Sequence, residues 1–163
     1  MKATLNVLTY ALEYLVGALL ATMAAALLLE VVLRFVFEIS LPWTSEFARY
    51  AMIWITFVGA ALAIKERSHI QINFFVRLLP KSIERYGYIA VNLILIAFVV
   101  VLLKNSIITV QTEMMVQTAA MNIPFGYIVL SLPLAGVFMI FYLLMDIKAL
   151  LNNEQVETPE EVA

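Results

Sequence analysis

Cysteine is absent from the 163-residue sequence, and histidine occurs once, as His69. The absence of cysteine excludes disulfides, thiol redox chemistry and thiolate metal sites. A haem held between helices by two histidines is excluded as well, because only one histidine is available. No nucleophile–base pair and no cluster of metal-ligating residues stands at a usable spacing. We therefore predict that the protein is not an enzyme and has no catalytic residue, metal site or cofactor.

Charged residues are also scarce. They form 13% of the chain, against about 25% in an average soluble domain, while 64% of the residues are hydrophobic, against about 45–50%. The formal net charge of −2 gives no support for a nucleic-acid partner. The polar stretches are too short to enclose a soluble core, and the apolar residues are gathered in long blocks. The sequence therefore predicts an all-α integral membrane protein.

The apolar blocks predict four transmembrane helices in a domain of residues 1–151. A helix that rises 1.5 Å per residue needs about 20 residues to cross the hydrocarbon core. The predicted helices cover about 8–37, 45–64, 82–103 and 124–146. Residues 152–163 are predicted to form an acidic cytoplasmic tail.

Two sequence features modify the third and fourth helices. Ile107 and Met114 keep helical spacing beyond the apolar block, so the third helix is expected to extend toward residue 118. The fourth helix is expected to begin at Pro124, where the missing N–H breaks no helical bond. Pro133 lies inside that helix and is expected to kink it.

Lysine and arginine are distributed unevenly over the connections between the helices. The connection between the second and third helices carries Lys65, Arg67, Arg77, Lys81 and Arg85, and Lys2 and Lys148 lie near the two ends. The other two connections supply Arg34, Arg49 and Lys104, all at helix edges. Because cytoplasmic loops carry the excess of positive charge, we predict that the second connection and both termini are cytoplasmic.

The second connection also carries a helical pattern. Ile72, Phe75 and Leu79 fall on one face of a helix over about 69–79. A polar row at spacings of four consists of His69, Asn73 and Arg77. This pattern predicts an amphipathic helix in the membrane surface, in contact with lipid. The alternative is a helix packed against a soluble partner.

Acidic and basic residues are paired at the edge of the first two helices. Glu30 precedes Arg34 by four residues, and Glu46 precedes Arg49 by three, so each pair can form an ion pair within its helix. Trp43 lies between them, where interfacial tryptophans collect. Glu30 and Arg34 are alternatively edge residues that reach water or a lipid phosphate. For Glu46 and Arg49 we favour contact with a partner.

The ordered motifs across these segments resemble one known family. Arg34, LPWTSEFARY at 41–50, Trp54, VGAALAIKERSHIQI at 58–72 and MNIPFGYIVLSLPLAG at 121–136 resemble the small membrane subunit, DctQ-like, of tripartite ATP-independent periplasmic (TRAP) transporters. The matching positions are Trp43, Glu46, Arg49, Gly59, Ala60, Ala61, Arg67, His69 and Ile70. The resemblance extends from Arg34 to about Leu144.

The resemblance implies a function in transport. It implies a scaffold subunit, in the bacterial inner membrane, of a sodium-coupled importer of organic acids of the C4-dicarboxylate or sialic acid class. Its partners would be a large elevator-type membrane subunit, held stably, and a periplasmic substrate-binding protein, met transiently. We expect the partner or lipid interface to include Glu30, Arg34, Trp43, Glu46, Arg49, Trp54, Gly59, Arg67, His69 and Arg77.

Two alternatives remain open at this point. A small proton-coupled exporter could use Glu13 or Glu30 as its membrane carboxylate. A structural membrane anchor of a respiratory complex would need no cofactor ligand of its own.

Overall fold

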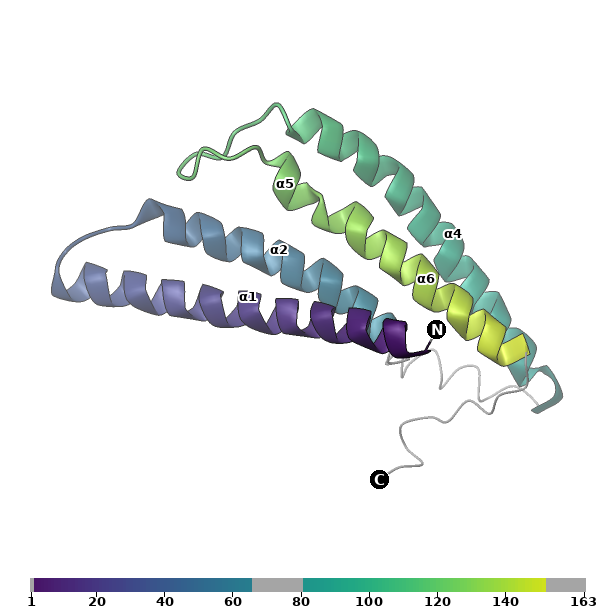
Figure 1. Ribbon diagram of the computed structural model, residues 1–163. Helices are drawn as coiled ribbons and strands as arrows, with labels where there is room; N and C mark the ends of the chain where they lie inside the picture. Colours follow the sequence, from purple (N-terminus) through teal and green to yellow (C-terminus); the bar gives the residue numbers. More distant parts are fainter. Residues whose placement is uncertain (1, 66–80, 152–163) are drawn as a thin grey trace, which may run out of the picture.

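The computed structural model describes residues 2–65 and 81–151, most of which lie in helices (Figure 1). The elements are α1 (Lys2–Val36), α2 (Pro42–Lys65), α4 (Lys81–Glu113), the short α5 (Gly126–Val129) and α6 (Ser131–Leu151). Four spans are long and apolar enough to cross a membrane: those in α1, α2 and α4, and the combined α5–α6 segment. The predicted all-helical architecture with four such helices is therefore observed. The predicted interfacial helix 69–79 and the tail 152–163 lie outside the described residues.

The helix boundaries follow from local chemistry. The helix α1 ends where Glu38 adopts a left-handed conformation (φ 58°), and the Ile39 N–H returns to the Leu33 carbonyl at 3.1 Å. The helix α2 begins at Pro42, three residues before the predicted start, because proline fits the first helical position. The helix α4 runs past the apolar block and ends at Glu113, short of residue 118.

The predicted fourth helix is divided into two parts. Pro124 does not start it, because this residue pairs with Gln117 in an isolated β-bridge, and α5 begins at Gly126. The break between α5 and α6 falls at Leu130, three residues before Pro133. Pro133 has no N–H for the carbonyl of Val129, which is the last residue of α5. Pro133 therefore separates the short helix α5 from α6 instead of kinking one continuous helix.

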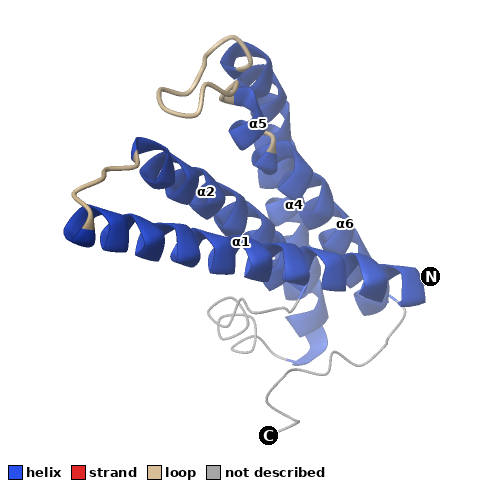
Figure 2. Cartoon of the chain, turned by 60° about the vertical axis from the view of Figure 1, so that its left-hand side comes forward, coloured by secondary structure: helices blue, strands red, loops and turns tan. Residues whose placement is uncertain are grey.

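The helices stand in a single row with the order α1, α2, α6, α4 (Figure 1). The helices α1 and α2 form one hairpin, and α4, α5 and α6 form a second. The two hairpins meet through α2 and α6 and diverge toward the end that carries residues 37–41 and 114–125 (Figure 2). We call this the loop end. The opposite end, with the start of α1 and the end of α6, is called the terminal end.

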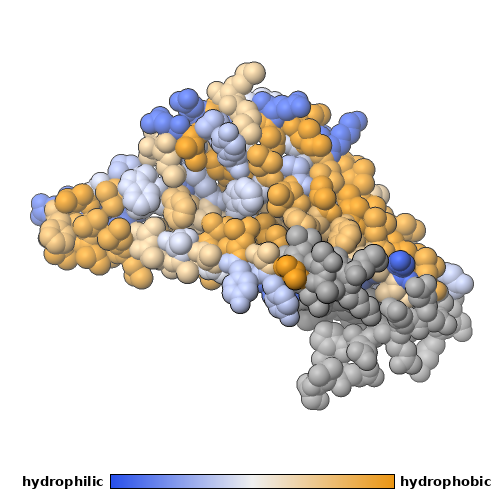
Figure 3. Space-filling model, viewed as in Figure 1, coloured by the Kyte–Doolittle hydropathy of each residue, from blue (hydrophilic) through white to orange (hydrophobic). Residues whose placement is uncertain are grey.

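Burial follows the order of the row. In the most apolar stretch of the α5–α6 span, 39% of the residues are buried, whereas the corresponding stretch of α1 contains no buried residue. The helices α4 and α6 approach closely at Gly136, where a Cβ atom would lie 2.9 Å from Cγ of Leu103. Large apolar side chains cover much of the outer surface, as the orange areas of Figure 3 show. Such a surface suits a chain whose solvent is lipid.

Candidate functional site

Glu46 joins the two hairpins at the loop end. Its side chain is half-buried near the start of α2, and each carboxylate oxygen accepts one backbone hydrogen bond from the other hairpin. Oε1 accepts from the Ala120 N–H and Oε2 from the Met121 N–H, both at 3.0 Å. Hydrogen bonds to an ionised carboxylate are among the stronger ones in proteins. Glu46 therefore holds residues 120 and 121 against α2.

The segment that Glu46 holds is an ordered turn. Thr118 is buried, its N–H donates to the Ile123 carbonyl at 3.0 Å, and its hydroxyl accepts from the Ile123 N–H at 3.1 Å. Asn122 takes the left-handed conformation (φ 52°) that reverses the chain. The Phe125 N–H closes the base of the loop on the Val116 carbonyl at 2.8 Å. Residues 116–125 thus form a turn that is closed by hydrogen bonds between its own residues.

An aromatic contact supports the same junction. The rings of Tyr50 and Phe125 meet edge to face, with centroids 5.8 Å apart and an interplanar angle of 77°. Tyr50 lies one helical turn after Glu46, so both residues face the turn from the same side of α2. Edge-to-face aromatic pairs contribute about 0.5–1.5 kcal/mol beyond their burial. The junction therefore combines a charged anchor with an apolar one.

A second polar contact at the loop end joins α1 to α2. The hydroxyl of Thr44, which is fully buried, lies 2.5 Å from Oε2 of Glu30 and 2.6 Å from the Leu41 carbonyl. Its single hydrogen can serve either acceptor. The Ser45 hydroxyl reaches the same Glu30 oxygen at 3.5 Å. Glu30 in α1 therefore accepts its hydrogen bond from α2 of the same chain.

The two expected ion pairs within helices are not formed. Within the described chain, neither the Glu30–Arg34 pair nor the Glu46–Arg49 pair comes within 4.0 Å, and both arginine side chains are exposed. The carboxylates of Glu30 and Glu46 accept hydrogen bonds from donors in other segments instead. These hydrogen bonds are partly buried, whereas the two arginine side chains are exposed. Arg34 and Arg49 remain available to a lipid or a partner.

Two contacts fasten the terminal end. Nζ of Lys65 in α2 lies 3.8 Å from Oε1 of Glu13 in α1. The hydroxyls of Thr9 in α1 and Tyr142 in α6 form a buried hydrogen bond at 3.2 Å.

Three threonines that make these contacts were not predicted from the sequence: Thr9, Thr44 and Thr118. A threonine in a helix or loop gives no signal in the sequence until its partner from a distant segment is known.

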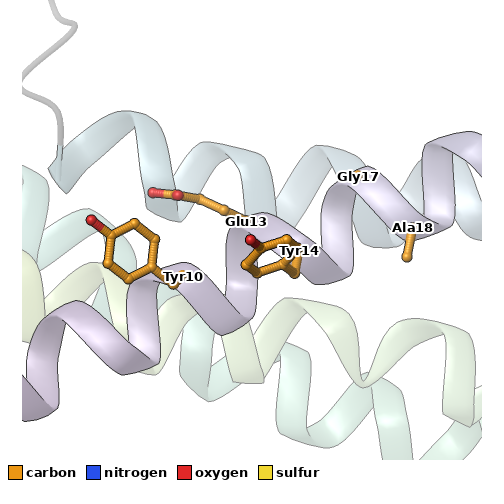
Figure 4. Close-up of a pocket in the computed structure, with 5 residues that line it drawn as sticks. All are labelled: Tyr10, Glu13, Tyr14, Gly17 and Ala18. Carbon is orange, nitrogen blue, oxygen red and sulfur yellow. The ribbon is translucent and has the colours of Figure 1, made fainter.

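A shallow groove of about 530 Å³ lies along α1 near this end. It is lined by Tyr10, Glu13, Tyr14, Gly17 and Ala18, which Figure 4 shows along one stretch of α1. Both tyrosines are largely exposed. Such amphipathic rings are common where a helix leaves the hydrocarbon core.

The remaining predicted site residues have different surroundings. Trp43 is 39% exposed and Trp54 is half-buried. A Cβ atom at Gly59 would meet nothing within 4 Å, so Gly59 makes no close helix contact within the described chain. Arg67, His69 and Arg77 lie outside the described residues.

The open side of α2 continues from these positions. Arg49, Met52, Thr56 and Ala60 are exposed, and they recur at spacings of three or four along the helix. Together with Gly59 they form what we call the open face of α2. Small and hydroxylated residues are typical of surfaces where membrane helices pack closely.

Known proteins show similarity to this chain over most of its length. A TRAP transporter small permease protein of Haemophilus influenzae is 38% identical over 80 residues, which are 49% of this chain and 50% of the relative. The sialic acid TRAP transporter small permease protein SiaQ of Vibrio cholerae is 26% identical over 129 residues, 79% of this chain and 75% of the relative.

A longer relative contains a segment of the same kind. The sialic acid TRAP transporter permease protein SiaT of Haemophilus influenzae is 24% identical over 129 residues, which are 79% of this chain and 21% of the relative. This chain therefore spans about half of the first Haemophilus influenzae relative and about a fifth of SiaT.

The profile of one family covers most of the described helices. It is the family described as tripartite ATP-independent periplasmic transporters, DctQ component, and it matches residues 23–153. The matched region includes the loop-end junction at Glu46, the open face of α2 and the whole of α4, α5 and α6. Because the match covers well over half of the sequence, the chain belongs to the DctQ family of TRAP transporter components.

Proposed function

We propose that this chain is a non-catalytic scaffold subunit of a sodium-coupled TRAP importer of organic acids. Its role is to hold the stationary part of a large elevator-type membrane subunit while the carrier part moves. The observation that carries this proposal is the single row of helices, fastened by polar contacts at both ends. The described part of such a row encloses no central pathway, but it offers broad apolar faces to a partner.

The proposed orientation in the bacterial inner membrane follows the positive charges. Lys65 and the basic residues up to Arg85 lie on the cytoplasmic side with both termini, and the loop end faces outward. The junction at Glu46 is then on the side where a periplasmic binding protein would deliver its substrate. Contact with that protein would be transient.

We assign the contact with the large subunit to the open face of α2. This helix is second in the row, yet its side with Arg49, Met52 and Thr56 is exposed. Gly59 and Ala60 leave room for a neighbouring helix, since a Cβ at Gly59 would meet nothing within 4 Å. Trp43 and Arg34 lie nearer the loop end and would contact lipid headgroups or the partner's edge.

The substrate class is proposed from the relatives. SiaQ and SiaT carry sialic acid in their names, and another relative, from Vibrio cholerae, is a C4-dicarboxylate TRAP transporter small permease protein, DctQ. Both substrates are organic acids. We therefore expect an organic acid to be the substrate of the complete transporter.

The test is uptake in proteoliposomes with an imposed sodium gradient. Three preparations are compared: this chain alone, the large subunit alone, and both together, each with the binding protein present. We expect uptake only when both membrane subunits are present. Substantial uptake by this chain alone, or full uptake by the large subunit alone, would refute the scaffold function.

A further inference from the structure

The two hairpins are joined at the loop end by a small group of contacts around Glu46. The hairpins diverge toward this end (Figures 1 and 2), and two backbone hydrogen bonds cross between them to the Glu46 carboxylate. The Tyr50 side chain adds a ring contact with Phe125. Glu46 is therefore placed to hold the turn 116–125 against the start of α2.

We propose that Glu46 is a positioning residue for transport: it fixes the turn 116–125 of one hairpin against the start of α2 in the other, and the rate of the partner's movement depends on that fixed turn. This inference rests on the proposed scaffold function. A frame that opens at one end cannot hold a stationary partner in one place while the carrier part moves.

The chemistry of the junction requires a carboxylate of this length. Both oxygens of Glu46 accept a backbone N–H at 3.0 Å. Glutamine would keep one acceptor but would turn an NH₂ donor toward the other N–H. Aspartate would be shorter by one methylene group, so that its oxygens could not reach both donors without movement of the turn. Neither substitution keeps both hydrogen bonds from Ala120 and Met121.

Loss of Glu46 should displace the turn rather than unfold it. The bonds between Thr118 and Ile123, and between Phe125 and Val116, lie within the loop and do not involve Glu46. The packing of α2 on α6 lies along the helices and is also independent of it. The variant should therefore keep the helices and the open face of α2, and lose the fixed position of residues 116–125.

The first experiment compares Glu46→Gln and Glu46→Ala with the matched control Glu38→Ala in the complete transporter. Glu38 is an exposed acid in the other connection at the loop end. Because this chain has no cysteine, the purified chain can be spin-labelled at Ile39→Cys and Ala119→Cys alone, both at exposed positions, before it is combined with the other subunits. Pulsed electron paramagnetic resonance then gives the distance between the two loops.

We expect one narrow distance distribution in the parent and in Glu38→Ala, and a broad one in both Glu46 variants. Loss of a charged hydrogen bond shifts a local equilibrium by about tenfold or more. We therefore expect the maximal uptake rate to fall by about tenfold, with the KM for substrate and the yield of co-purified large subunit unchanged. A purely structural role would instead lower the yield in step with uptake.

A rescue experiment provides the second test. Glu46→Cys combined with Ala120→Cys should lose uptake until a short, reductant-cleavable thiol cross-linker joins the two residues, and should lose it again on reduction. Normal uptake in the Glu46 variants, an unchanged distance distribution, or failure of the cross-link to restore uptake would overturn the proposal. If the large subunit without this chain took up substrate as fast as the complete transporter, the scaffold function itself would be refuted. The comparison of proteoliposomes with and without this chain shows that result independently of the Glu46 variants.

Discussion

At the scale of single residues, a few polar side chains form the hydrogen bonds that join separate segments of the chain. Glu30 and Glu46 both lie near a helix edge, where water, lipid or an arginine could have satisfied them. The structure instead gives each a donor from another segment, Thr44 in one case and two backbone N–H groups in the other. Polar contacts of this kind stabilise membrane helix pairs by about 0.6 kcal/mol on average, and more where an ionised group is bonded.

The contact of Glu30 with Thr44 leads to a stability prediction. Glu30→Ala should lower the free energy of unfolding by about 0.5–1.5 kcal/mol, because Thr44 loses its hydrogen bond to α1, while its hydroxyl still donates to the Leu41 carbonyl. Glu30→Gln should have a smaller effect, since its amide oxygen still accepts. Thermal unfolding in mild detergent measures both, with Glu38→Ala as the control. An equal loss for alanine and glutamine would contradict this role.

A substitution at Glu13 separates the scaffold from a proton-coupled exporter. Glu13 contacts Lys65 across an exposed part of the surface, a pair that contributes about 0–1 kcal/mol. Glu13→Gln should therefore leave assembly and uptake within about twofold of the parent. Uptake by the reconstituted transporter checks this, with co-purification as the measure of assembly. Abolished transport in an intact complex would favour the exporter.

At the scale of helices, close approach between α4 and α6 depends on one glycine. A Cβ at Gly136 would lie 2.9 Å from Leu103 Cγ, whereas a Cβ at Gly17 on α1 would meet nothing within 4 Å. These two positions show which faces are already packed within the chain. The helix α6 is central in the row, and α1 lies at its edge, where the faces that α2 does not cover are open to lipid or a partner.

The glycines give a matched pair of substitutions. Gly136→Leu should lower the unfolding temperature and cost about 1–3 kcal/mol or more, because an overfilled contact forces α4 and α6 apart. Gly17→Leu adds the same side chain where space is open and should have little effect on the isolated chain. Thermal unfolding of the purified subunit compares them. Equal destabilisation by the two substitutions would show that the packing around each glycine does not determine the loss of stability.

At the scale of the molecule, the row of helices leaves surface that the chain itself does not cover. Its outer surface carries large exposed apolar side chains on α1, α2 and α4. Lipid can cover most of it, but the open face of α2 carries small and hydroxylated residues at Thr56, Gly59 and Ala60. This difference is why we place the large subunit there.

Two alanines test the location of the partner. Ala60→Leu on the open face of α2 should reduce co-purification of the large subunit by about tenfold, because the added side chain prevents close helix packing. Ala97→Leu places the same side chain on an exposed position of α4 and should leave the yield unchanged. The ratio of the two subunits after affinity purification is the measurement. Similar yields for both variants would move the interface elsewhere.

Labelling of single cysteines tests the orientation of the whole chain. Met115→Cys in the loop-end connection should react with a membrane-impermeant thiol reagent added outside intact cells. Arg67→Cys should react only after the membrane is opened. Labelling of Arg67→Cys in intact cells would reverse the proposed orientation.

Composition and spacing in the sequence were enough to predict the class of protein and the number of helices. Long apolar blocks cannot be placed in water, and their lengths match the bilayer, so four helices are expected from these features alone. The motifs from Arg34 to Leu144 also indicate the family. Such signals lie within one segment and need no knowledge of its neighbours.

The partner that each polar group takes depends on the three-dimensional fold. Spacing within a helix predicted Glu30 with Arg34 and Glu46 with Arg49, yet the competing donors come from residues 14 and about 75 positions away. The start of the last span at Gly126 rather than at Pro124 likewise depends on how residues 114–125 fold, because Pro124 pairs with Gln117. A carboxylate binds whatever donor the fold brings nearest, and the row of helices sets that proximity.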